Sequence, residues 1–180
     1  MKRKIHVYKS LFVCIVFIAC SLAINVHAGG RKVLDGAVAP IFTGIDFNDK
    51  AFDLMDHLKK KPIVINFLST RCVSCLSVVK TLEKYKSENK LTDDKMLFVY
   101  VSLDDWKKEA HVPPVWKEVF SKDKLLLNDG SRKISKMYEV DTLPATILIG
   151  KSGNIFYRRD DYNKFFEKEI KRELGDFILK

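Results

Sequence analysis

Cys72 and Cys75, separated by two residues, are the side chains of this sequence with the clearest capacity for covalent chemistry. Two thiols this close can form and break a disulfide with each other, and a thiolate is the nucleophile in disulfide exchange. A disulfide that closes so short a loop constrains the unfolded chain very little, because its stabilising effect grows with loop length. The spacing therefore favours reversible redox chemistry over a structural cross-link.

The cysteine pair follows an apolar run at 63–68 and precedes a segment with apolar residues at helical spacing. The run is typical of a strand that is buried on both faces. The apolar face of the predicted helix consists of Cys75, Val78, Val79, Leu82 and Tyr85. We expect Cys72 at the helix N-terminus, where free N–H groups and the helix dipole favour a thiolate. Cys72 is then the attacking thiol and Cys75, one turn further and more buried, the resolving thiol, with Arg71 adding positive charge.

Strand and helix patterns alternate along the rest of the chain. A strand, a polar turn and a second strand are expected between Ile41 and Leu54. Further strands are predicted at 96–101, 125–127, 145–149 and 154–158, and further helices at 115–120, 131–138 and 162–177. This alternation predicts an α/β fold with a mixed sheet.

Residues 1–28 have the composition of a secretory signal peptide: a basic start, an apolar stretch at 11–24 and small residues up to Ala28. The apolar stretch is shorter than the roughly 20 residues of a membrane-spanning helix. A retained membrane anchor is the second alternative, and lipidation of Cys20 is the third. We predict a signal peptide over 1–28, one domain over 29–180, and an extracytoplasmic location, the bacterial periplasm, after cleavage near Ala28.

The charge distribution argues against a nucleic-acid partner. Removal of residues 1–28 takes away four of the 32 Lys and Arg and none of the 23 Asp and Glu, so the formal net charge falls from +9 to +5. The remaining basic clusters, at 59–61 and 158–159, are short, and we expect them to be solvated ends of secondary-structure elements.

Metal binding is the main alternative use of the two thiols. A structural zinc site needs four ligands, and beyond residue 28 the chain has only His57 and His111 to add. Copper bound by both thiols and a His, as in a metal chaperone or binding module, is a second hypothesis. The leading interpretation requires neither a resident metal nor a cofactor.

Three motifs in order along the chain carry a family resemblance: 36–42, 61–67 leading into the cysteine pair, and 138–149. With these motifs the chain resembles the TlpA/ResA-like branch of exported thioredoxin-fold proteins, which is related to peroxiredoxins. The resemblance implies a thioredoxin-like α/β fold, with a central mixed sheet flanked by helices and an N-terminal β-hairpin extension.

The resemblance also implies further site residues. Pro144 matches a proline that is cis in this family and packs beside the cysteine pair, a geometry found almost only at proline. The backbone of Leu143 is then expected to hydrogen-bond to a client peptide. We expect Arg71, Val73 and Ser74, which flank or separate the cysteines, to modulate the pKa of the thiols.

Several positions depart from the family pattern. Arg71 replaces a Trp, Val73-Ser74 lacks the Pro that is common between the cysteines, and Val78 stands where ResA-like members carry a Glu. Asn66 does fit this branch.

The resemblance implies a reductase of disulfides in exported client proteins, supplied with electrons by a membrane thiol–disulfide donor. Cytochrome c maturation is one possible setting, and the absence of the Glu at Val78 weakens that assignment. A peroxiredoxin-like peroxidase is a further alternative. Ser69 has the spacing of that motif's hydroxyl residue, but Ile65 stands where the motif needs proline.

Overall fold

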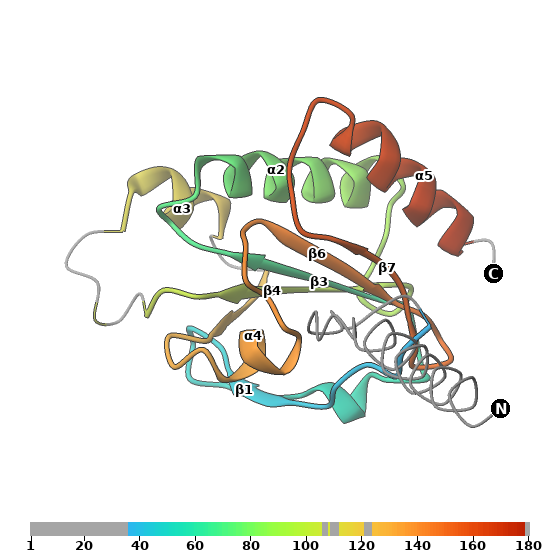
Figure 1. The fold of residues 1–180 in the computed structure, drawn as a ribbon, viewed down its shortest axis with the longest axis horizontal. Helices are drawn as coiled ribbons and strands as arrows, with labels where there is room; N and C mark the ends of the chain where they lie inside the picture. Colours follow the sequence, from blue (N-terminus) through green and yellow to red (C-terminus); the bar gives the residue numbers. More distant parts are fainter. Residues whose placement is uncertain (1–35, 106–107, 109–111, 121–123, 179–180) are drawn as a thin grey trace, which may run out of the picture. The chain divides into compact units, whose positions relative to one another are not determined.

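The computed structural model describes residues 36–105, 108, 112–120 and 124–178, and within them a five-stranded mixed sheet is the framework (Figure 1). The strand order is β5-β4-β3-β6-β7. The strands are β3 (Ile63–Leu68), β4 (Leu97–Ser102), β5 (Leu125–Asn128), β6 (Ala145–Ile149) and β7 (Ile155–Arg159). β3, β4 and β5 run parallel, whereas β6 is antiparallel to both β3 and β7. The predicted mixed sheet is confirmed, with β3 at its centre.

Helices cover both faces of this sheet (Figure 1). The helices are α2 (Val73–Glu88), α3 (Pro114–Val119), α4 (Lys133–Met137) and α5 (Phe166–Ile178). In the view of Figure 1, α2 and α5 lie above the sheet, and α4 lies below it. No helix in the described part of the chain is long and apolar enough to cross a membrane.

The core has two apolar layers because side chains alternate along each strand. In β3, Ile63, Ile65 and Phe67 belong to the layer with Phe42 and Tyr138, on the side of α4. Val64 and Leu68 belong to the layer beneath α2 and α5. The face predicted for the helix after the cysteines is the buried face of α2, so its helical spacing was interpreted correctly.

The N-terminal hairpin is formed by β1 (Thr43–Ile45) and β2 (Ala51–Asp53). The Asp46 carboxylate accepts hydrogen bonds from the backbone N–H groups of Asn48 and Lys50, which explains the tight polar turn. Asp53 then caps the short 3-10 helix η1 (Leu54–Asp56). The predicted hairpin extension is confirmed, whereas the signal peptide predicted over 1–28 lies outside the described residues.

Candidate active site

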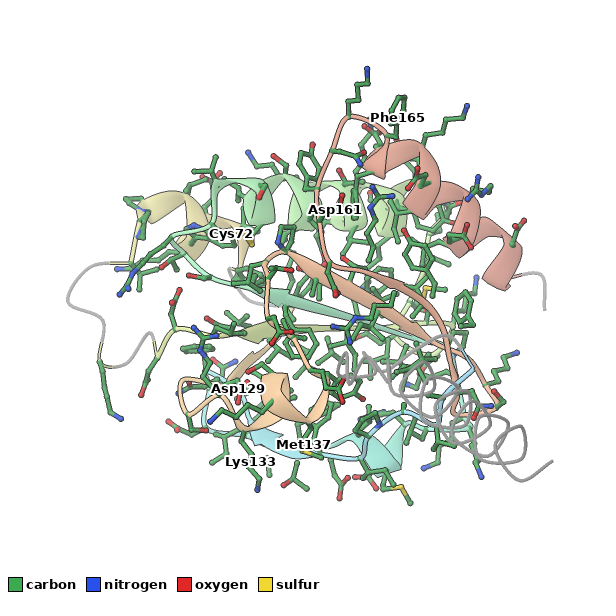
Figure 2. All side chains as sticks on the ribbon, viewed as in Figure 1. Cys72, Asp129, Lys133, Met137, Asp161 and Phe165 are labelled. Carbon is green, nitrogen blue, oxygen red and sulfur yellow. A yellow bond between two sulfur atoms is a disulfide. The ribbon has the colours of Figure 1, made fainter. Side chains whose placement is uncertain are left out.

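The two cysteines are joined by a disulfide at the start of α2, and their Cα atoms are 5.2 Å apart. Figure 2 shows Cys72 at this end of the helix. Cys72 is the N-cap residue, and its sulfur accepts a hydrogen bond from the Cys75 N–H at 3.1 Å. Cys72 is partly exposed, whereas Cys75 is completely buried. The pair therefore has one sulfur that a partner can reach and one that is enclosed.

A short loop connects the end of β3 to Cys72. Ser69 organises this loop, because its carbonyl accepts from the Cys72 N–H at 3.1 Å and its hydroxyl accepts from the Arg71 N–H at 3.2 Å. The sequence folds this way because a fully apolar strand ends at Leu68 and is followed by small polar residues that satisfy the turn.

The carboxylate of Asp104 holds the same loop from the neighbouring strand. It accepts hydrogen bonds from the Ser69 hydroxyl at 3.0 Å, the Thr70 hydroxyl at 2.9 Å and the Thr70 N–H. Its own backbone is fixed by Ser102, whose hydroxyl donates to the Asp104 carbonyl and accepts from the Asp104 N–H. Asp104 is nearly buried, at 9% exposure.

Asp104 was not among the residues predicted for the site, although the sequence held a signal for it. It follows the strand predicted at 96–101 by three residues, and the carboxyl ends of parallel strands lie at the same edge of a sheet. β3 and β4 are such a parallel pair, with Leu68 opposite Ser102. A polar residue after the second strand is therefore expected near the loop that follows the first.

The residues between and before the cysteines lie in different environments. The Ser74 hydroxyl is 3.5 Å from the Cys72 sulfur, within hydrogen-bonding range for sulfur. Val73 is 88% exposed and presents an apolar side chain next to Cys72. Arg71 is also exposed. Of the three residues predicted to modulate the thiols, Ser74 contacts the Cys72 sulfur, and Val73 contributes apolar surface.

The Leu143–Pro144 peptide bond is cis, as the resemblance implied. Pro144 is buried, and Leu143 is partly buried and packs against both apolar layers. Ala145, the next residue, pairs with Phe67 across β6 and β3. This register brings the Leu143–Pro144 segment to the same edge of the sheet as the loop that carries Cys72.

Arg158 corrects one prediction, because the 158–159 cluster is not a solvated element end. The Arg158 side chain is only 7% exposed and is paired with the Asp160 carboxylate at 2.9 Å. Its two terminal nitrogens donate to the carbonyls of Tyr138 and Glu139. The apolar stem and planar guanidinium of Arg suit such a buried position, which its charge alone does not predict. Arg158 therefore holds the start of the 138–144 loop.

Two positions that were compared with the family pattern are completely buried, Val78, which departs from it, and Asn66, which fits it. Val78 is completely buried in the same apolar layer as Cys75, so an apolar side chain occupies the place of the family's Glu. Asn66 is completely buried as well, and its amide nitrogen donates to the Ala145 carbonyl and the Thr146 hydroxyl. The Asn66 side chain thus links β3 to β6 close to the Leu143–Pro144 segment.

His57, a candidate ligand in the metal hypothesis, lies at the end of η1. Its ring stacks on Phe52 with centroids 5.3 Å apart. Burial, followed by the charge of Lys61, lowers the pKa of His57. Across the described ranges no three His, Cys, Asp or Glu side chains are grouped so that they could hold a metal ion. His111 lies outside those ranges.

The sheet is thioredoxin-like, and a disulfide joins the N-cap residue of α2 to a buried cysteine one turn further along the helix. Together these two features define the class of thioredoxin-fold thiol–disulfide oxidoreductases. The comparisons with known proteins agree with this class. The chain belongs to the Redoxin family, whose model matches residues 34–173.

One curated relative and two solved structures illustrate the similarity. The chain is 26% identical over 163 residues to the thiol-disulfide oxidoreductase ResA of Bacillus subtilis (strain 168), covering 86% of this chain and 85% of ResA. The thioredoxin domain of a thiol-disulfide oxidoreductase from Bacteroides vulgatus has a TM-score of 0.63 at 23% identity, covering 81% of this chain and 98% of that domain. A secreted Mycobacterium tuberculosis disulfide oxidoreductase has a TM-score of 0.59 at 20% identity, and the match covers 75% of this chain and 95% of that protein's chain. At these identities the two structures support the fold alone.

Proposed function

We propose that the protein reduces disulfides in extracytoplasmic client proteins through the Cys72–Cys75 pair. The observation that carries the proposal is the unequal exposure of the two cysteines, Cys72 partly exposed and Cys75 buried. A client disulfide can reach only the outer sulfur. The inner thiol is positioned to attack a client that is already attached to Cys72.

The proposed reaction transfers two electrons in two exchange steps. In the reduced protein, the Cys72 thiolate attacks one sulfur of the client disulfide, so that a mixed disulfide forms and the other client sulfur leaves as a thiolate. Cys75 then loses its proton and attacks the Cys72 sulfur, which releases the second client thiolate. The client takes up two protons, and the protein is left with the Cys72–Cys75 disulfide seen in this structure.

The environment of Cys72 supports its role as the attacking thiol. Its sulfur already accepts a hydrogen bond from the Cys75 N–H at the N-terminus of α2, and the Ser74 hydroxyl lies within reach. Both donors and the helix dipole favour a thiolate at this position. We further propose that the backbone of Leu143 pairs with an extended client segment, as a peptide adds to a strand edge.

The export of the protein and its source of electrons belong to the same proposal. The signal-peptide pattern of residues 1–28 supports export, and one structurally similar protein is described as secreted. An exported reductase must be reduced again after each cycle, and a membrane thiol–disulfide donor would supply the two electrons. Cytochrome c maturation, with apocytochrome c as the client, is one candidate setting, and the replacement of the family's Glu by Val78 argues against it.

Two cysteine variants test the proposal. Cys72→Ser should abolish disulfide exchange, because no exposed thiol remains. Cys75→Ser should accumulate mixed disulfides with clients, because the step that releases them is lost, and mass spectrometry of the trapped species would identify the clients. The double variant is the matched control for non-specific capture.

Exchange activity that survives in Cys72→Ser would contradict the proposal, as would the absence of any trapped client in cells that express Cys75→Ser. Stoichiometric copper on the purified, reduced wild-type protein would favour the metal-chaperone alternative instead.

A further inference from the structure

The carboxylate of Asp104 is the buried anion of the described residues that contacts the loop leading into Cys72. All three of its side-chain hydrogen bonds come from Ser69 and Thr70, the first two residues of that loop. These donors fix its position, and its 9% exposure limits screening by solvent. Asp104 is therefore a fixed negative charge beside the redox pair.

The path from Asp104 to Cys72 is short. The carboxylate contacts the backbone N–H of Thr70. Thr70 and Cys72 are two residues apart, so their Cα atoms are at most about 7 Å from each other. The Cys72 N–H also turns back onto the Ser69 carbonyl, which keeps the loop compact. The carboxylate and the Cys72 sulfur are thus separated by on the order of 10 Å, a range at which charges interact appreciably across protein.

We propose that the Asp104 carboxylate disfavours the Cys72 thiolate and thereby biases the pair toward its disulfide, which makes the protein a stronger reductant. The inference rests on the proposed function and gives it a direction of electron flow. A negative charge near a thiolate raises the free energy of the reduced, ionised pair. The oxidised pair carries no charge and is not affected in this way.

Other charged groups near this edge are engaged elsewhere or act in the opposite sense. Asp105 is paired with Lys108 and bonded to Asn128. The carboxylate of Asp129 is committed to the backbone N–H groups at the start of α4. Arg71 is exposed, and as a cation it favours the thiolate. Asp104 is thus the positioning residue whose charge opposes the helix N-terminus at Cys72.

Three variants separate the charge of Asp104 from its structural contacts. Asp104→Asn removes the charge and keeps the shape, because the hydroxyls of Ser69 and Thr70 can rotate to accept from the new amide. Thr70→Val keeps the charge and removes one hydrogen bond. Asp105→Asn is the matched control, since it removes an adjacent charge that is paired with Lys108 and hydrogen-bonded to Asn128.

The readouts are the pH profile of Cys72 alkylation by iodoacetamide and the equilibrium constant of the pair with glutathione, measured on the folded protein. For Asp104→Asn we expect alkylation below the Cys72 pKa to become about threefold faster, because the thiolate fraction rises. We also expect the glutathione equilibrium to shift toward the reduced protein, so that the variant is a weaker reductant. Thr70→Val should leave both values unchanged or move them in the opposite direction, and Asp105→Asn should leave both unchanged.

Equal shifts in the same direction for Asp104→Asn and Thr70→Val would overturn the inference, since loop geometry and not charge would then set the equilibrium. No shift for Asp104→Asn would overturn it as well. Both results leave the proposed function intact as long as the wild-type pair equilibrates reversibly with glutathione. A wild-type pair that fails to equilibrate would instead contradict the proposed function.

Discussion

Two loops meet at the edge of the sheet where Cys72 lies, and they are held by charges of opposite sign. The 69–72 loop follows β3 and is held by the Asp104 carboxylate. The 138–144 loop precedes β6 and is held by the Arg158 guanidinium. β3 and β6 are neighbours. Arg158 lies in β7, on the outer side of β6, and Asp104 comes two residues after the end of β4, on the outer side of β3. The redox pair and the cis-proline segment are thus each supported from the adjacent strand.

The sign of each charge matches the backbone groups that it binds, an N–H for Asp104 and carbonyls for Arg158. Thr70 lies in the loop before α2, two residues ahead of the N-cap Cys72, and its N–H needs an acceptor. The 138–144 loop leaves the C-terminus of α4, where carbonyls lack partners and a donor is needed. Asp104 accepts from the Thr70 N–H, and Arg158 donates to the Tyr138 carbonyl. Backbone polarity therefore accounts for the two opposite charges.

The largest effect on stability is expected from removal of the Arg158 guanidinium. Arg158→Ala removes the guanidinium donors of the Tyr138 and Glu139 carbonyls and the ion pair between Arg158 and the Asp160 carboxylate, which is 14% exposed. We expect a loss of about 3 kcal/mol in the free energy of unfolding, measured by urea denaturation. Because the loop that carries Leu143 also loosens, the KM for a peptide disulfide should rise.

Arg172→Ala, at a residue that is 64% exposed, is the control and should leave the urea midpoint unchanged. If Arg158→Ala keeps the wild-type urea midpoint, the 138–144 loop does not depend on the Arg158 guanidinium. The two loops would then not both be held by a charged side chain.

Removal of the Asp104 carboxylate should lower stability less than removal of the Arg158 guanidinium. Asp104→Ala removes three hydrogen bonds, but two of the donors are hydroxyl groups of Ser69 and Thr70 that can rotate toward water. We expect a loss of about 2 kcal/mol in the free energy of unfolding, mainly from the partly buried N–H of Thr70, in the same denaturation experiment. A loss larger than that of Arg158→Ala would reverse the expected order of the two loops.

Tyr138 provides a pH-dependent test of the second loop. Its hydroxyl donates to the Pro40 carbonyl at 2.8 Å, and burial raises the pKa of Tyr138 well above its usual value. The contribution of a neutral, buried tyrosine is complete below the unfolded pKa of about 10 and is lost as the pH rises further. Tyr138→Phe should lower stability by about 1 kcal/mol at neutral pH and make the loss of stability in alkali less steep. An alkaline profile identical to that of the wild type would contradict this assignment.

The sequence predicted the elements of this site better than the residues that support them. The apolar run of β3 and the apolar face of α2 are local patterns, so the Cys72 junction could be located without the structure. Asp104 and Arg158 carry charges that are usually solvated. Their burial depends on the pairing of β4 with β3 and of β7 with β6, which local periodicity does not specify. The Leu143–Pro144 segment was found through family resemblance, because proline before a strand is common in other settings as well.

The smallest changes in stability are expected from two threonine variants, one in each loop, which together test whether the loops are independent. The Thr142 hydroxyl, which is exposed, donates to the Asp160 carbonyl, whereas the Thr70 hydroxyl donates to the Asp104 carboxylate, so these two hydrogen bonds have different acceptors. We expect Thr142→Val to cost about 0.5 kcal/mol and Thr70→Val about 1 kcal/mol, because the second hydrogen bond is less exposed. The double variant should lose the sum of the two within about 0.5 kcal/mol in urea denaturation, as is usual for separate sites. A larger discrepancy would show that the loops are coupled, and coupling that passes through the cysteine pair should disappear when the disulfide is reduced.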